Sequence, residues 1–67
     1  MLSVQAGELY RVKEEYSYME GEVLRAGELH LVTHSYGWIM HTMSSGRLHT
    51  WYIYDFLSHV ERAEERS

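Results

Sequence analysis

The sequence contains no cysteine and no proline, and Lys13 is its only lysine. Without cysteine the chain forms neither disulfides nor thiolate zinc sites, and a reducing compartment such as the cytoplasm is expected. Proteins that bind nucleic acid usually gather Lys and Arg on one surface. Here the arginines are scattered and the formal net charge is −4, which disfavours a nucleic-acid partner.

Long hydrophobic runs are also missing. No stretch of about 20 consecutive apolar residues occurs, and the first five residues lack a basic segment followed by an apolar one. We therefore expect neither a membrane-spanning segment nor a secretory signal.

A chain of 67 residues has room for one hydrophobic core. We assign a single domain to residues 1–60 and a charged tail, expected to fray, to residues 61–67. A core of this size supplies only a few kcal/mol, so small domains often need a further source of stability. With disulfides excluded, the aromatic residues and self-association are the sources that remain.

The five glycines recur at intervals of roughly ten residues, and the segments between them are rich in β-branched and aromatic residues. This spacing of turn residues predicts a mainly β protein. We expect five strands, at residues 8–13, 21–26, 28–35, 37–43 and 48–54. Asp55 is a candidate N-cap for a short C-terminal helix, because Phe56, Leu57, Val60 and Ala63 follow at roughly helical spacing.

Two details of the strands can be predicted from residue alternation. In the third strand, Leu29, Leu31 and Thr33 alternate with His30, Val32 and His34, and we expect the leucines to face the core. In addition, residues 6–12 resemble residues 26–32. We interpret this similarity as one local device used twice, a glycine turn that leads into a strand.

The segment Ser44-Ser45-Gly46 predicts a hairpin between the last two strands. A three-residue loop would place His41 opposite His49 and Ile39 opposite Trp51, with Trp51 buried. A two- or four-residue loop would shift the register by one residue and pair His49 with Thr42.

Five histidines raise the question of a metal site. In the three-residue register His41 and His49 would lie about 5 Å apart, so they are weak candidates for metal ligands. Half-buried histidines without a metal are the favoured interpretation, and no cofactor is assigned. The five histidines gain charge between about pH 7 and pH 5. Acid destabilises the fold if they are buried neutral, as we expect for His41 and His49, and stabilises it if His30, His34 and His49 lie beside the acidic segments.

Five short strands, a long acidic connection at residues 14–20 and a terminal helical turn together resemble an SH3-like small barrel. The resemblance is one of pattern and involves no family motif. It implies a binding groove between the first long loop and the end of the terminal hairpin. Tyr16, Tyr18 and either Trp38 or Trp51 would then lie close together.

No nucleophile with an ordered base, paired catalytic carboxylates or phosphate-binding glycine loop is visible, so we do not expect an enzyme. A domain this small cannot bury nine large aromatic rings, and exposed Tyr and Trp are enriched at protein interfaces. The candidate binding residues are Tyr16, Tyr18, Tyr36 and Trp38.

The sequence therefore predicts a small protein-binding module or regulator of the adaptor or inhibitor type, such as phage and mobile elements encode. One alternative is a structural subunit that forms a homo-oligomer by pairing its sheet edges. Another is a small barrel that stacks single-stranded nucleic acid on its aromatic residues.

Overall fold

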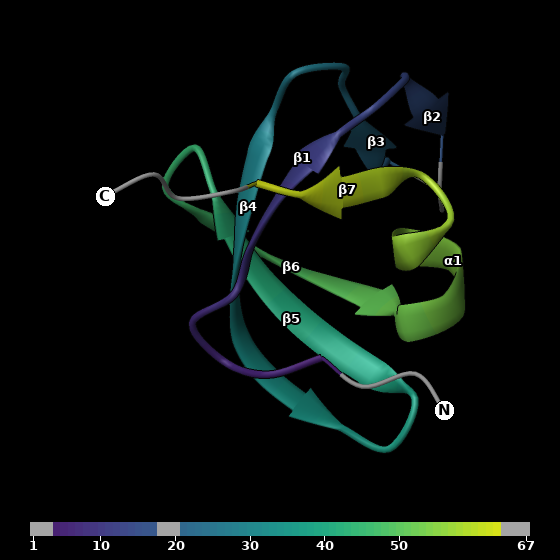
Figure 1. Ribbon diagram of the computed structural model, residues 1–67. Helices are drawn as coiled ribbons and strands as arrows, with labels where there is room; N and C mark the ends of the chain where they lie inside the picture. The colour runs from purple at the N-terminus through teal and green to yellow at the C-terminus, as the bar shows by residue number, and fades with distance from the viewer. Residues whose placement is uncertain (1–3, 18–20, 64–67) are drawn as a thin grey trace.

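The computed structural model describes residues 4–17 and 21–63, which form a mainly β fold with one short helix (Figure 1). A five-stranded antiparallel sheet has the order β6-β5-β4-β1-β7, and β2 pairs with β3 in a separate two-stranded sheet. The larger sheet is open, with β6 and β7 at its edges. The elements are β1 (Leu9–Val12), β2 (Tyr16–Ser17), β3 (Val23–Leu24), β4 (Leu29–Tyr36), β5 (Ile39–Ser44), β6 (Arg47–Tyr52), α1 (Ile53–Leu57) and β7 (Val60–Arg62).

The hairpin between β5 and β6 has a two-residue loop. Ser45 and Gly46 both have positive φ, 53° and 74°, as a type I′ turn requires at its two central residues. Ser44 pairs with Arg47, and Thr42 with His49. The predicted three-residue loop is therefore wrong and the shifted register is confirmed. The type I′ turn is favoured because its twist matches that of the two strands it joins.

The predicted inner face of β4 is also wrong. His30 and Val32 are each only 1 % exposed, whereas Leu29 and Leu31 are 46 % and 42 % exposed. Burial of His30 is possible because its ring finds polar partners inside the sheet, as described below. Between Val32 and His34 the register with β5 shifts by one residue, and this β-bulge turns His34 away from the core.

The similar segments 6–12 and 26–32 do form the same local structure. Glu8 and Glu28 each donate a backbone N–H to the residue three positions earlier, Gln5 and Arg25 respectively. The carboxylate of each glutamate accepts the backbone N–H of that same residue. Each turn contains a glycine with positive φ and leads into a strand, and the two strands, β1 and β4, pair with each other.

The C-terminal helix is shorter than the spacing of apolar residues predicted. It begins after Tyr52, so Asp55 lies in its first turn and is not the N-cap. Val60 belongs to β7, which pairs with β1, and the predicted helical role of Val60 is wrong. In the described part of the chain no helix is long and apolar enough to cross a membrane.

The core lies on the inner side of the larger sheet and is covered by α1. Trp51 is fully buried, as predicted, and Phe56 on α1 lies 5.6 Å from it between ring centroids. Tyr10 meets Phe56 edge to face. The other buried members of the cluster are Val4, Val12, Leu24, Val32, Met40, Ile53 and Val60.

We expect Trp51→Ala to reduce the free energy of unfolding by about 3–5 kcal/mol, because it empties the largest side chain of the core. A domain of this size has only about 5 kcal/mol in total, so at most about 2 kcal/mol would remain and the urea midpoint should fall sharply. The measurement is urea denaturation followed by circular dichroism. Trp38→Ala is the matched control, since Trp38 is 70 % exposed and its loss should change the midpoint little. Equal midpoints for the two variants would contradict the assigned core.

Candidate functional site

The strongest candidate site is an aromatic surface at the end of the β4–β5 hairpin, formed by Trp38, Tyr52 and Tyr54. Their exposed fractions are 70 %, 49 % and 62 %. Trp38 lies in the two-residue turn between Tyr36 and Ile39. Gly37 takes φ +63° there, as the first central residue of a type II′ turn does, and this leaves the indole pointing outward from a tight turn.

The helix α1 is held against this turn. The backbone N–H of Ile53 donates to the carbonyl of Trp38 over 2.8 Å. Because Ile53 is buried and anchors the first turn of α1, Tyr54 next to it is brought beside the indole while remaining exposed. This hydrogen bond continues the β5–β6 ladder, in which Ile39 pairs with Tyr52, and brings the start of α1 onto the turn.

Two hollows flank Trp38 and Tyr54. The first has a volume of about 310 Å³ and is lined by these two residues with Gly37 and Ile53. The second, of about 560 Å³, is lined by Trp38, Ile39, Tyr52, Tyr54 and Asp55. The second hollow is in the size range of small ligand or peptide side-chain pockets, and its lining is mostly apolar with one carboxylate at the side.

The predicted binding residues are only partly brought together. Tyr36 is 59 % exposed and precedes the turn that carries Trp38. Tyr16 is half-buried against the core and stacks on His59, with ring centroids 3.8 Å apart. It does not line either hollow beside Trp38. Tyr18 lies outside the described residues.

Sequence reasoning missed Tyr52 and Tyr54. A signal was present, because Trp51 and Ile53 alternate with these tyrosines and both are buried. Had Trp51 and Ile53 been taken together as inward positions, Tyr52 and Tyr54 would have been predicted to face outward.

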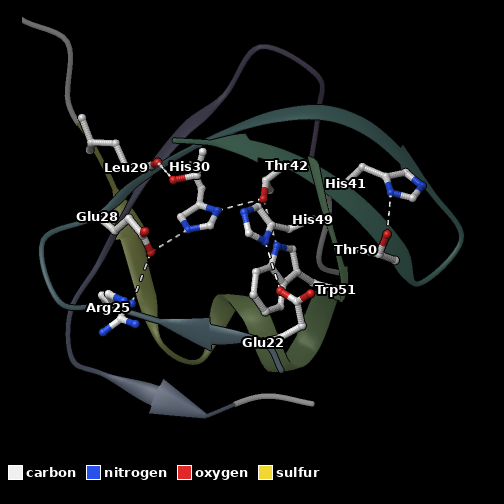
Figure 2. A network of polar contacts seen from close by, with 11 residues as sticks. Glu22, Arg25, Glu28, Leu29, His30, His41, Thr42, His49, Thr50 and Trp51 are labelled. Carbon is white, nitrogen blue, oxygen red and sulfur yellow. Dashed lines mark hydrogen bonds and ion pairs between the residues drawn. The ribbon is translucent and has the colours of Figure 1, made fainter. Parts of the chain in front are cut away.

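A second group of interest is a buried chain of polar contacts that joins Glu28, His30, Thr42 and Trp51 (Figure 2). His30 Nδ1 lies 2.8 Å from Thr42 Oγ1, and His30 Nε2 lies 3.3 Å from Glu28 Oε1. Trp51 Nε1 donates to the same Thr42 oxygen over 2.9 Å. The order carboxylate, imidazole, hydroxyl is that of nucleophilic relays in hydrolases.

This arrangement serves the fold and not nucleophilic attack. Thr42 is 0 % exposed, so no substrate reaches its hydroxyl. The indole N–H can only donate, so Thr42 Oγ1 accepts it, and the Thr42 O–H is left to donate a hydrogen bond to His30 Nδ1. His30 is then neutral, and its Nε2–H donates to Glu28. In this protonation state both ring nitrogens of His30, the hydroxyl of Thr42 and the indole N–H of Trp51 have a partner.

Burial lowers the pKa of His30, and the nearby carboxylate of Glu28 opposes this shift without overcoming it. The close contact with Glu28 is therefore a hydrogen bond to a neutral ring and not an ion pair. Positive charge on His30 would also place a second donor on Thr42 Oγ1, whose own hydrogen would lose its acceptor.

The proposed metal pair is separated. His41 pairs with Thr50 and His49 with Thr42, and the two imidazoles lie on opposite faces of the sheet. His41 lies between the hydroxyl groups of Tyr36 and Thr50, whereas His49 stacks on Trp51 and contacts Glu22. Between residues 4–17 and 21–63, no three His, Asp or Glu side chains gather in a way that could hold a metal ion.

We expect the free energy of unfolding to fall as the pH drops below about 6.5, and His30 to be the main cause. Its pKa is lower in the folded than in the unfolded state, so below pH 6.5 the unfolded chain binds more protons and acid favours unfolding. The loss for one such group is at most about 1.4 kcal/mol per pH unit. The measurement is urea denaturation from pH 8 to pH 5.

His30→Gln should reduce this pH dependence, and His34→Gln, which changes an exposed ring on the same strand, should preserve it. If the two variants gave the same slope against pH, the assignment to His30 would be wrong. The pH dependence is therefore assigned to His30 and not to the predicted pair, His41 and His49, because these two residues do not face each other.

Comparison of the chain with protein families, with curated proteins and with solved structures gave no match.

Proposed function

We propose that this chain is a small non-catalytic protein-binding module that holds an extended segment of its partner against the aromatic surface of Trp38, Tyr52 and Tyr54. The observation that carries the proposal is the exposure of Trp38, 70 %, beside a hollow of about 560 Å³. Tryptophan and tyrosine dominate the binding energy of protein interfaces, because large rigid rings bury much surface at little cost in entropy.

An SH3-like arrangement is the finer fold assignment that we propose. It is supported by the long connection between β1 and β4, which contains the β2–β3 hairpin, and by the helical turn that precedes the last strand. Figure 1 shows β1 and β7 above β5 and β6 in the view, with α1 at the right, between the end of β6 and the start of β7. The sheet is not closed, so the proposed relationship is to an open form of such a barrel.

The buried relay supports a non-catalytic role. Glu28, His30 and Thr42 have the order of a hydrolase relay, but the side chain of Thr42 is fully buried on the inner side of the sheet. Adaptor or inhibitor action in a reducing compartment such as the cytoplasm agrees with these features and with the lack of cysteine.

A protein partner is favoured over single-stranded nucleic acid. Bases could stack on Trp38 and Tyr54, but Asp55 lines the same hollow and would repel a phosphate backbone. Lysine and arginine are both absent from the residues that line the two hollows beside Trp38.

The proposal is tested by selecting peptides from a random displayed library on the untagged full chain and measuring their affinity by isothermal titration calorimetry, with tryptophan fluorescence as a second measurement on the wild type. Binding should shift the emission of exposed Trp38 to shorter wavelength. Trp38→Ala should weaken the selected peptides by at least about 30-fold, as expected for a hot-spot residue.

Leu29→Ala is the matched control, because Leu29 is 46 % exposed but does not line either hollow. It should leave the affinity unchanged. Failure to select any peptide would contradict the proposal, and so would peptides whose binding survives Trp38→Ala.

A further inference from the structure

The outward face of the larger sheet carries three rows of side chains that run across neighbouring strands. The pairing of strands places Leu9, Leu31, Met43 and Leu48 in one continuous row. A second row contains His34, His41 and Thr50, and a third contains Tyr36, Ile39 and Tyr52. We call these ten residues the outer sheet face.

Two of the three rows of the outer sheet face consist of aliphatic or aromatic residues, and most of these are exposed to solvent. Leu31, Met43 and Leu48 are 42 %, 39 % and 55 % exposed, and Tyr36 and Tyr52 are 59 % and 49 % exposed. With about 200 Å² for each large side chain, these five leave roughly 500 Å² open, and the other residues of the face, among them the polar His34, His41 and Thr50, raise its total exposed area to roughly 700 Å². The largest apolar patch of a typical monomer is about 300–600 Å², and such a patch is often functional.

No residue of the outer sheet face is Asp, Glu, Lys or Arg. Formal charges begin at its border, where Arg11 on β1 pairs with Glu61 on β7. A centre depleted of charged residues, with a polar and charged rim, is the usual composition of a protein interface. The chain as a whole has a net charge of −4, so two copies repel each other, and they repel least when such uncharged faces meet.

We propose that the outer sheet face binds a second copy of this chain to form a symmetric homodimer. The open area of roughly 700 Å² is close to the roughly 800 Å² per partner that stable interfaces bury. The same contact would add the stability that a chain of 67 residues without disulfides needs.

The order of the rows suits two-fold symmetry. The leucine row and the tyrosine row lie on either side of the middle row. A two-fold axis along the middle row would place the leucine row of one copy on the tyrosine row of the other. Large aromatic rings would then pack on flexible aliphatic side chains twice, as an interface between identical surfaces requires.

Sedimentation velocity of the untagged full chain, from low to high micromolar concentration, tests the proposal. Wild type should form a dimer. Leu31→Lys and Met43→Lys should each raise the dissociation constant by at least about 30-fold, because a lysine would be buried against the apolar side chains of the other copy. Both positions are exposed in the single chain, so circular dichroism should show that the variants fold.

Trp38→Lys is the control that separates this face from the aromatic surface, and it should leave the dimer intact. A loss of peptide binding with an unchanged dimer would therefore concern the proposed function alone. A dimer that survives Leu31→Lys would overturn the inference and favour edge pairing through β6, because β4 lies inside the sheet and not at its edge. Wild type that stays monomeric at high micromolar concentration would also overturn it.

Discussion

The orientation of the whole sheet depends on the hydrogen bond between His30 and Thr42. These two residues are 12 positions apart in the sequence and belong to the neighbouring strands β4 and β5. Once His30 and Thr42 both point inward, Met40 and Ser44 on β5 must point inward as well, because side chains alternate along a strand. Leu31 and Met43 must then point outward. The indole N–H of Trp51 fixes β6 to the same threonine, so one hydroxyl group aligns three strands.

The class of the fold was predictable because it depends on local chemistry. Glycines with positive φ mark the turns, and Gly46 marks the hairpin whichever loop length is used. Burial of Trp51 was also predictable, since both registers place it mid-strand opposite Ile39 or Met40. The strands β2 and β7 were not predicted, because two or three residues carry too little alternation to distinguish a strand from a loop or a helical turn.

The inner face of β4 could not be derived from the sequence for a different reason. Transfer of leucine from water to the core is more favourable than transfer of histidine, so the pattern predicted that Leu29 and Leu31 lie inside. His30 is accommodated only because Thr42 and Glu28 satisfy both ring nitrogens, and Thr42 comes from another strand.

The prediction of Trp38 and Tyr36 as exposed residues succeeded because it rested on a local feature, the glycine turn between them. The predicted proximity of His41 and His49 failed because it rested on the hairpin register.

The inward histidine also accounts for the two exposed surfaces. Because His30 and Val32 take the inner positions of β4, the leucines of the neighbouring strands gather on the outside and create the outer sheet face. The β-bulge after Val32 then brings Tyr36 to the same outside, opposite Ile39. Ile39 and Tyr52 belong to this face and also line the larger hollow beside Trp38. A partner segment in that hollow and a second copy on the sheet would therefore touch the same two side chains, and thermodynamic linkage makes the affinity for one depend on the presence of the other.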